Sequence, residues 1–103
     1  MIKLSEVKGE AALEMTADLL EPIEEIVTNG VTAAYIAEGK HSKMAIAAHL
    51  LRHCKKPVIK ILAILNGKSV DEYESEMNMA SLPVALLSVL NDKELMALFN
   101  VQF

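Results

Sequence analysis

The chain has 103 residues, of which 52% are hydrophobic and 23% are charged, and its formal net charge is −4. This length predicts one domain with a single core, and the composition excludes disordered and fibrous chains. The negative net charge disfavours nucleic acid as the main partner.

Apolar residues recur at helical spacing in the first part of the chain. They predict a helix over residues 10–20. Pro22 fits the first turn of a continuing helix, because proline is tolerated at that position. Asn29 and Gly30 form a dipeptide that is typical of a turn, so we expect this helical region to end there.

Two further helices are predicted before the middle of the chain. The first covers residues 31–38, and Ser42 is the expected N-cap of the second, over residues 43–55. We place Lys55 and Lys56 at the C-terminal end of the second helix, where cations are favourable. The inner face of this helix is expected to carry Met44, Ala47, Ala48, Leu51 and Cys54.

Residues 58–65 are apolar almost all round. A strand is one interpretation, because valine and isoleucine are abundant there, but the chain offers no partner strand. A helix that is apolar on every face belongs in a core. We therefore predict an all-α fold, a single domain over residues 1–103 with six to seven short helices around a central apolar helix at residues 57–66.

Capping signals mark the helices that follow. Ser69 and Glu72 form a capping box that opens a short polar helix. Ser81 is the expected N-cap of a helix over residues 82–90, whose first turn tolerates a proline.

The end of the chain carries more apolar residues than two short helices bury easily. Asn91 and Glu94 form a second capping box that opens the last helix, and residues 100–103 are expected to be a flexible tail. Six residues are candidates for a partner-binding surface: Leu86, Leu90, Leu95, Met96, Leu98 and Phe99. The alternative is that most of them pack on the central helix.

Charged residues are segregated along the chain. From residue 9 to residue 39 all of them are acidic, and from residue 40 to residue 69 all are basic. Either these segments pack side by side and neutralise each other within one molecule, or they form a bipolar surface that drives homo-oligomer formation or binds a charged partner. The candidate residues for self-association are Glu21, Glu24, Glu25, Arg52, Lys55 and Lys56.

Few groups are arranged for catalysis. His49 and His53 have the i, i+4 spacing that can hold zinc, but the glutamate of a zinc-protease motif is missing between them. We expect two partly exposed histidines there and no metal site. Cys54 has no second cysteine with which to form a disulfide, and we expect it to be a buried small hydrophobe. The sequence therefore predicts no enzyme, no catalytic residue and no cofactor.

Two further functions stay open, and the cellular location is an expectation. Residues 43–65 have the length of a helix-turn-helix in a small DNA-binding regulator, although the second helix offers only Lys60 for contacts with bases. A metal-binding module around His49 and His53 is the third alternative. No signal-peptide pattern and no apolar stretch of membrane-spanning length occurs, so we expect a cytosolic protein that makes no use of the membrane.

Several segments of the chain carry helix caps, turns and apolar positions in an order that is also found in a known family. They are residues 2–13, 17–23 and 59–67, the triplet Asp71-Glu72-Tyr73, Leu82-Pro83, and residues 90–95. Together they resemble the tail assembly chaperones of long-tailed phages and prophages of Gram-positive bacteria. The resemblance covers most of the chain, and residues 31–41 fit it least.

This resemblance implies a helical, non-enzymatic protein. Members of the family coat the long helical tape-measure protein, keep it soluble and help to recruit tail-tube subunits around it. Many are the short product of a gene whose longer product arises by ribosomal frameshifting. The implied partners are thus the tape-measure protein, the tail-tube protein and a frameshifted longer form of the chain. The implied location is the cytoplasm of the bacterial host, with no copy in the mature virion.

Overall fold

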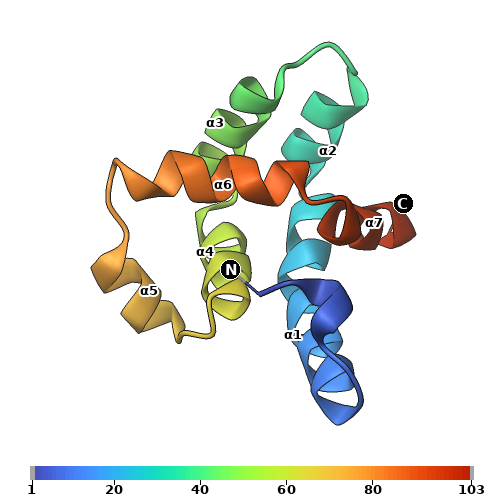
Figure 1. The fold of residues 1–103 in the computed structure, drawn as a ribbon. Coiled ribbons are helices and arrows are strands. Elements are labelled where there is room, and N and C mark those ends of the chain that lie inside the picture. Colours follow the sequence, from blue (N-terminus) through green and yellow to red (C-terminus); the bar gives the residue numbers. More distant parts are fainter. Residues whose placement is uncertain (1, 103) are drawn as a thin grey trace.

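A computed structural model describes the backbone of residues 2–102 and the side chains of residues 2–99. Within these limits the chain folds into one compact all-α globule without strands, as predicted (Figure 1). A short 3-10 turn, η1 (Leu4–Glu6), precedes seven helices. They are α1 (Glu10–Val27), α2 (Gly30–Ala37), α3 (Lys43–His53), α4 (Lys55–Leu65), α5 (Val70–Glu76), α6 (Ser81–Asn91) and α7 (Lys93–Gln102).

The central apolar helix is confirmed as α4. Its buried residues are Pro57, Val58, Ile61, Leu62, Ala63 and Leu65. It packs against α1, α3 and α5, which accounts for its apolar character on nearly every face. The rest of the core cluster comes mainly from α1, α3, α6 and α7: Leu19, Ile23, Ile26, Ala47, Leu50, Cys54, Leu86, Val89 and Leu95.

The first helix is longer than predicted. α1 runs without a break through Pro22, which is buried inside it. All the buried residues of α1 lie at or after Leu19. Residues 10–18 contain none, and this half of the helix extends away from the globule at the bottom of Figure 1.

The boundary between α3 and α4 differs from the prediction. α3 ends at His53, and the backbone of Cys54 leaves the helical region with φ −132° and ψ 41°. Pro57 explains this position, because proline fits the first turn of a helix but not its interior. Lys55 and Lys56 therefore lie in the first turn of α4, at the positive end of its dipole, and not in the last turn of α3.

Two of the predicted helix N-caps are confirmed, and a third prediction is wrong. Ser42 caps α3, and Ser69 and Glu72 form the predicted capping box of α5. Ser81, the predicted cap of α6, is instead the first residue of that helix. The side chain of Asn78 takes the capping position, since its Oδ1 accepts hydrogen bonds from the backbone N–H groups of Ala80 and Ser81.

The last helix also has a different cap. Asp92, and not Asn91, accepts hydrogen bonds from the backbone N–H groups of Glu94 and Leu95. The carboxylate of Glu94 accepts one from the backbone N–H of Ser5, so it ties η1 to α7 instead of closing a capping box. α7 continues to Gln102, through three of the four residues for which a tail was expected, and residue 103 lies outside the described residues.

Candidate functional site

The six apolar residues proposed for partner binding lie against the core. Leu86 and Leu95 are buried within it, and the other four are partly buried against it: Leu90, Met96, Leu98 and Phe99. The prediction of an exposed surface is therefore wrong for Leu86 and Leu95. The reason is that α6 and α7 close one side of the fold, since α6 packs on α3 and α7 on α1.

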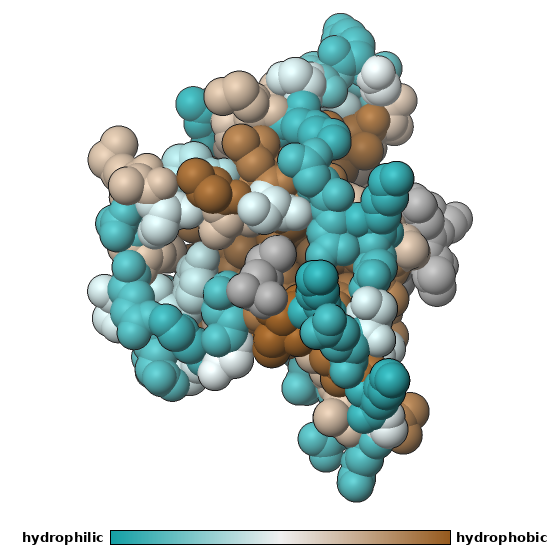
Figure 2. Space-filling view, viewed as in Figure 1, coloured by the Kyte–Doolittle hydropathy of each residue, from teal (hydrophilic) through white to brown (hydrophobic). Residues whose placement is uncertain are grey.

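Other large apolar residues are the exposed ones. They are Leu13, Val31, Ile36, Met44, Met79 and Val84. Figure 2 shows that hydrophobic side chains reach the surface along α6 and in the middle of this face, between hydrophilic areas. Two of the six, Met79 and Val84, lie at or near the start of α6, beside a concave surface.

This concave surface lies between α5 and α6, and we call it the α5–α6 groove. It has a volume of about 540 Å³ and is lined by Asn66, Lys68, Tyr73, Glu76, Met77, Ser81, Val84, Ala85 and Ser88. Val84 is 65% exposed there, and Met79, in the adjoining turn, is 94% exposed. Lys68 and Glu76 form an ion pair at the rim. The lining of the groove therefore combines four apolar or aromatic residues with five polar ones, of which the two charged ones pair with each other.

A second apolar depression lies on the other side of Met77, and we call it the junction hollow. Its lining consists of Leu51, Lys55, Val58, Ile59, Met77 and Leu82, and its volume is about 260 Å³. The side chains come from α3, α4 and α6 and from the turn after α5. Lys55 is the one charged residue in this lining.

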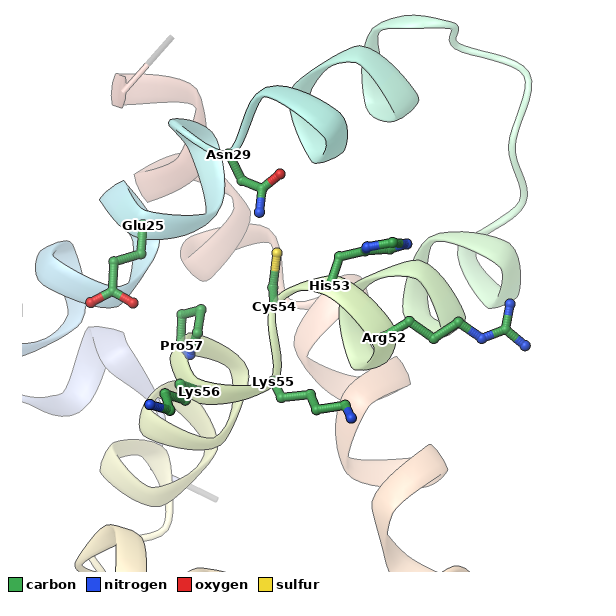
Figure 3. A pocket seen from close by; sticks show the side chains of 8 residues that line it. All are labelled: Glu25, Asn29, Arg52, His53, Cys54, Lys55, Lys56 and Pro57. Atoms are coloured by element: carbon green, nitrogen blue, oxygen red, sulfur yellow. The ribbon is translucent and has the colours of Figure 1, made fainter.

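Lys55 also lines a neighbouring polar cleft at the junction of α3 and α4, shown in Figure 3. This junction cleft is lined by Glu25, Asn29, Arg52, His53, Cys54, Lys55, Lys56 and Pro57. Four of the six residues predicted for self-association thus meet here: Glu25, Arg52, Lys55 and Lys56. In Figure 3 the side chains of Arg52 and Lys55 extend away from Glu25, while Lys56 extends to the same side as Glu25.

The acidic and basic segments neutralise each other only in part. The carboxylate of Glu21 pairs with Lys60, with 3.4 Å between Oε1 and Nζ, so this acid is engaged within the molecule. Among the described residues, no ion pair within 4 Å involves Arg52, Lys55 or Lys56. A basic surface is therefore left over at the α3–α4 junction.

The histidines lie in a different arrangement from the one expected. His49 is buried, and its Nε2 lies 2.9 Å from the hydroxyl of Thr32, which lies 3.3 Å from the Cys54 thiol. Tyr35 stacks between His41 and His49, with ring centroids 3.7 and 4.2 Å apart. Burial lowers the pKa of His49 below its usual 6.5, and the nearby His53 and His41 lower it further.

This cluster also explains an error on α3. Met44 and Ala48, predicted for the inner face, are exposed, whereas Ala47, His49 and Leu50 are buried. The hydrogen bond to Thr32 and the stacking on Tyr35 compensate the burial of a polar ring, so His49 takes a place that apolar periodicity would give to another residue. Cys54 is buried, as expected.

The structure also bears on the alternative sites. Among the described residues, no group of three or more histidine, cysteine, aspartate or glutamate side chains is placed to hold a metal ion. The helix expected to read DNA is α4. It packs against α1, α3 and α5 and buries six of its 11 residues, and its charged residues at the surface are Lys55, Lys56 and Lys60. Within the described part of the chain, no helix combines the length and apolar character needed to cross a bilayer.

Comparison of the chain with family models, with curated proteins and with solved structures found no match. The candidate site therefore stands on its own geometry: a groove whose two charged lining residues pair with each other, and an apolar hollow beside basic residues that have no ion pair among the described residues.

Proposed function

We propose that this protein is a tail assembly chaperone of a long-tailed phage or prophage, which binds an apolar helical client, the tape-measure protein. In this role it keeps the client soluble and helps to recruit tail-tube subunits. The proposal is supported by the resemblance of residues 2–13, 17–23 and 59–67 to that family, and by the surface of the α5–α6 groove. The groove is the observation that carries it.

The α5–α6 groove has the form that an amphipathic helix needs. Helices that dock in grooves insert side chains spaced three or four residues apart into an apolar floor. Here Tyr73, Met77, Val84 and Ala85 supply the apolar part of the lining. Burial of an exposed valine or methionine side chain contributes about 1.5–3 kcal/mol, so Val84 and Met79 are the residues with most to gain from a client.

The groove also suits a client with many similar segments. Methionine is flexible and polarisable, so Met77 and Met79 can adapt to different apolar side chains. The ion pair of Lys68 and Glu76 joins the two charged residues that line the groove, whereas Asp71, Glu72 and Glu74 of α5 lie outside its lining. The groove therefore selects apolar helical segments by their shape and hydrophobicity more than by their charge.

The test is co-expression of the chain with the tape-measure protein encoded in the same prophage or phage, followed by measurement of client solubility and co-purification. The wild-type chain is expected to keep the client soluble. Val84→Asp places a carboxylate in the groove, which costs several kcal/mol if it is buried without a partner, and is expected to lower client recovery at least about tenfold.

Val31→Asp on α2 is the matched control, because Val31 is 63% exposed and Val84 is 65% exposed. It makes the same chemical change outside the groove and is expected to leave recovery at the wild-type level. Equal recovery with both variants would reject the groove as the client site. Failure of the wild-type chain to retain the client, together with tight salt-dependent binding of DNA, would reject the proposed function.

A further inference from the structure

α2 is attached to the rest of the fold by few buried side chains. Of its eight residues Thr32 is buried, Ala33 and Tyr35 are half-buried, and the others are exposed. A two-residue turn joins α2 to α1, and α3 is its other main neighbour, beside it at the top of Figure 1. Among the side chains that the structure describes, the core cluster and those packed against it include none from α2. A helix with so few buried contacts can open without unfolding the core.

Four aromatic rings hold α2 against α3, and we call them the ring stack: His41, Tyr35, His49 and His53. Tyr35 of α2 lies between two of them, with its ring centroid 3.7 Å from that of His41 and 4.2 Å from that of His49. The fourth ring has its centroid 4.5 Å from that of His49. Beside the stack, the hydroxyl of Thr32 lies 2.9 Å from Nε2 of His49 and 3.3 Å from the Cys54 thiol, which points toward the start of α2 in Figure 3. α2 is thus joined to α3 mainly through the buried His49.

The ring stack gains positive charge in acid. Three of its four rings are imidazoles, whose ordinary pKa is about 6.5. A positive charge on His49 is buried and lies near His53 and His41, and both effects lower the pKa of His49. Among the described residues, no carboxylate forms an ion pair with His49 that would offset the charge. When α2 moves away, water reaches the ring and solvates the charge, so protonation and release of α2 favour each other.

We propose that the ring stack is an acid-released latch: when His49 is protonated, α2 detaches from α3 while the other helices stay packed. Thr32 and Tyr35 then leave the His49 ring, and the Cys54 thiol becomes accessible to solvent. Below about pH 6.5 each further pH unit shifts the equilibrium toward release by up to about tenfold, until the closed form also binds the proton. This inference does not rest on the proposed client, because every group in the latch belongs to this chain.

The charged groups around the ring stack do not offset this effect. Oε2 of Glu38, in the loop after α2, lies 2.7 Å from Nε2 of His41 and 3.7 Å from Nζ of Lys40, so this carboxylate is already engaged. α2 and α6, which both pack on α3, carry no charged side chain. At the other end of the stack, His53 lines the junction cleft together with one acid and three bases: Glu25 of α1, Arg52 of α3, and Lys55 and Lys56 of α4. Cations therefore outnumber carboxylates near the stack, which favours release of the charged ring.

The test measures the reaction of Cys54, the single cysteine of the chain, with dithiodipyridine from about pH 7 to about pH 5. Each rate is divided by that of the urea-unfolded chain at the same pH, which removes the pH dependence of the thiol chemistry itself. This reactivity ratio is expected to rise about tenfold across the range. Hydrogen exchange at the acidic end should show lost protection in residues 30–37 and retained protection in residues 55–65.

Two variants remove the titrating ring, and a third is the control. T32V/H49F replaces both partners of the buried hydrogen bond by apolar groups, which can leave stability nearly unchanged, and H49Q keeps a neutral hydrogen-bonding side chain. In both variants the reactivity ratio is expected to stay constant within about twofold. The control H53Q removes an exposed imidazole but keeps His49, so it should retain most of the rise.

Three results would overturn the latch. The first is a wild-type reactivity ratio that does not change with pH. The second is a rise that persists in the variants without His49 or disappears in H53Q. The third is a loss of protection in residues 55–65 together with residues 30–37, because the whole chain then unfolds instead of releasing α2.

Discussion

Two leucine-to-alanine substitutions test the central packing of the fold. Leu62 in α4 has no exposed surface, whereas Leu13 in α1 is 74% exposed. Leu62→Ala removes the same atoms as Leu13→Ala but leaves a cavity among α1, α4 and their neighbours. A fully buried leucine replaced by alanine costs about 2–5 kcal/mol of unfolding free energy, and for a chain of this length that corresponds to a fall in Tm of roughly 10–30 °C.

Leu13→Ala is expected to change the unfolding free energy by no more than about 0.5 kcal/mol, because an exposed helical leucine buries little and alanine favours helices. The assay is urea unfolding followed by circular dichroism, in high salt and dilute protein so that the chain is monomeric, because association would add to the apparent stability. A loss of less than about 1 kcal/mol for Leu62→Ala would refute the placement of α4 at the centre of the core. Equal losses for the two variants would refute the exposed position of Leu13.

Three further predictions concern polar groups. The pKa of His49 is lower in the folded chain than its usual 6.5, so the unfolded chain binds a proton first as the pH falls. The unfolding free energy should therefore decrease from pH 7 to pH 5. In urea titrations the His49→Phe variant should show a smaller decrease. Thr32→Val removes the hydroxyl that bonds the buried His49 ring and should cost about 1–3 kcal/mol, whereas Thr16→Val at an exposed position should cost less than 1 kcal/mol by the same measurement. Ser69→Ala should cost about 0.5–2 kcal/mol through loss of the capping box of α5, while Ser75→Ala in the same helix should be nearly neutral in thermal unfolding.

The elements that depend on local chemistry could be predicted from the sequence. The run from Val58 to Leu65 has no polar face, so it could only be placed in a core, and α4 lies there. Ser42 and Ser69 are followed by helical patterns that leave one choice of cap, and both are confirmed. At Ser81 the local signal was ambiguous, because Asn78 stands three residues earlier and caps as well as serine does.

Exposure could not be predicted in the same way, because it depends on what each helix packs against. The C-terminal apolar residues looked surplus because the space between α3 and α1, which α6 and α7 cover, is not visible in the sequence. Conversely, Val84 and Leu13 are exposed although both are large and apolar, because no other helix covers them.

The proposed client contact rests on apolar burial. The only charged residues that line the α5–α6 groove are Lys68 and Glu76, and they pair with each other. High salt does not weaken apolar burial. Client retention by the groove should therefore persist as the salt concentration rises. Retention through Arg52 and Lys55, which pair with no acid among the described residues, should instead fall, because salt screens exposed charges.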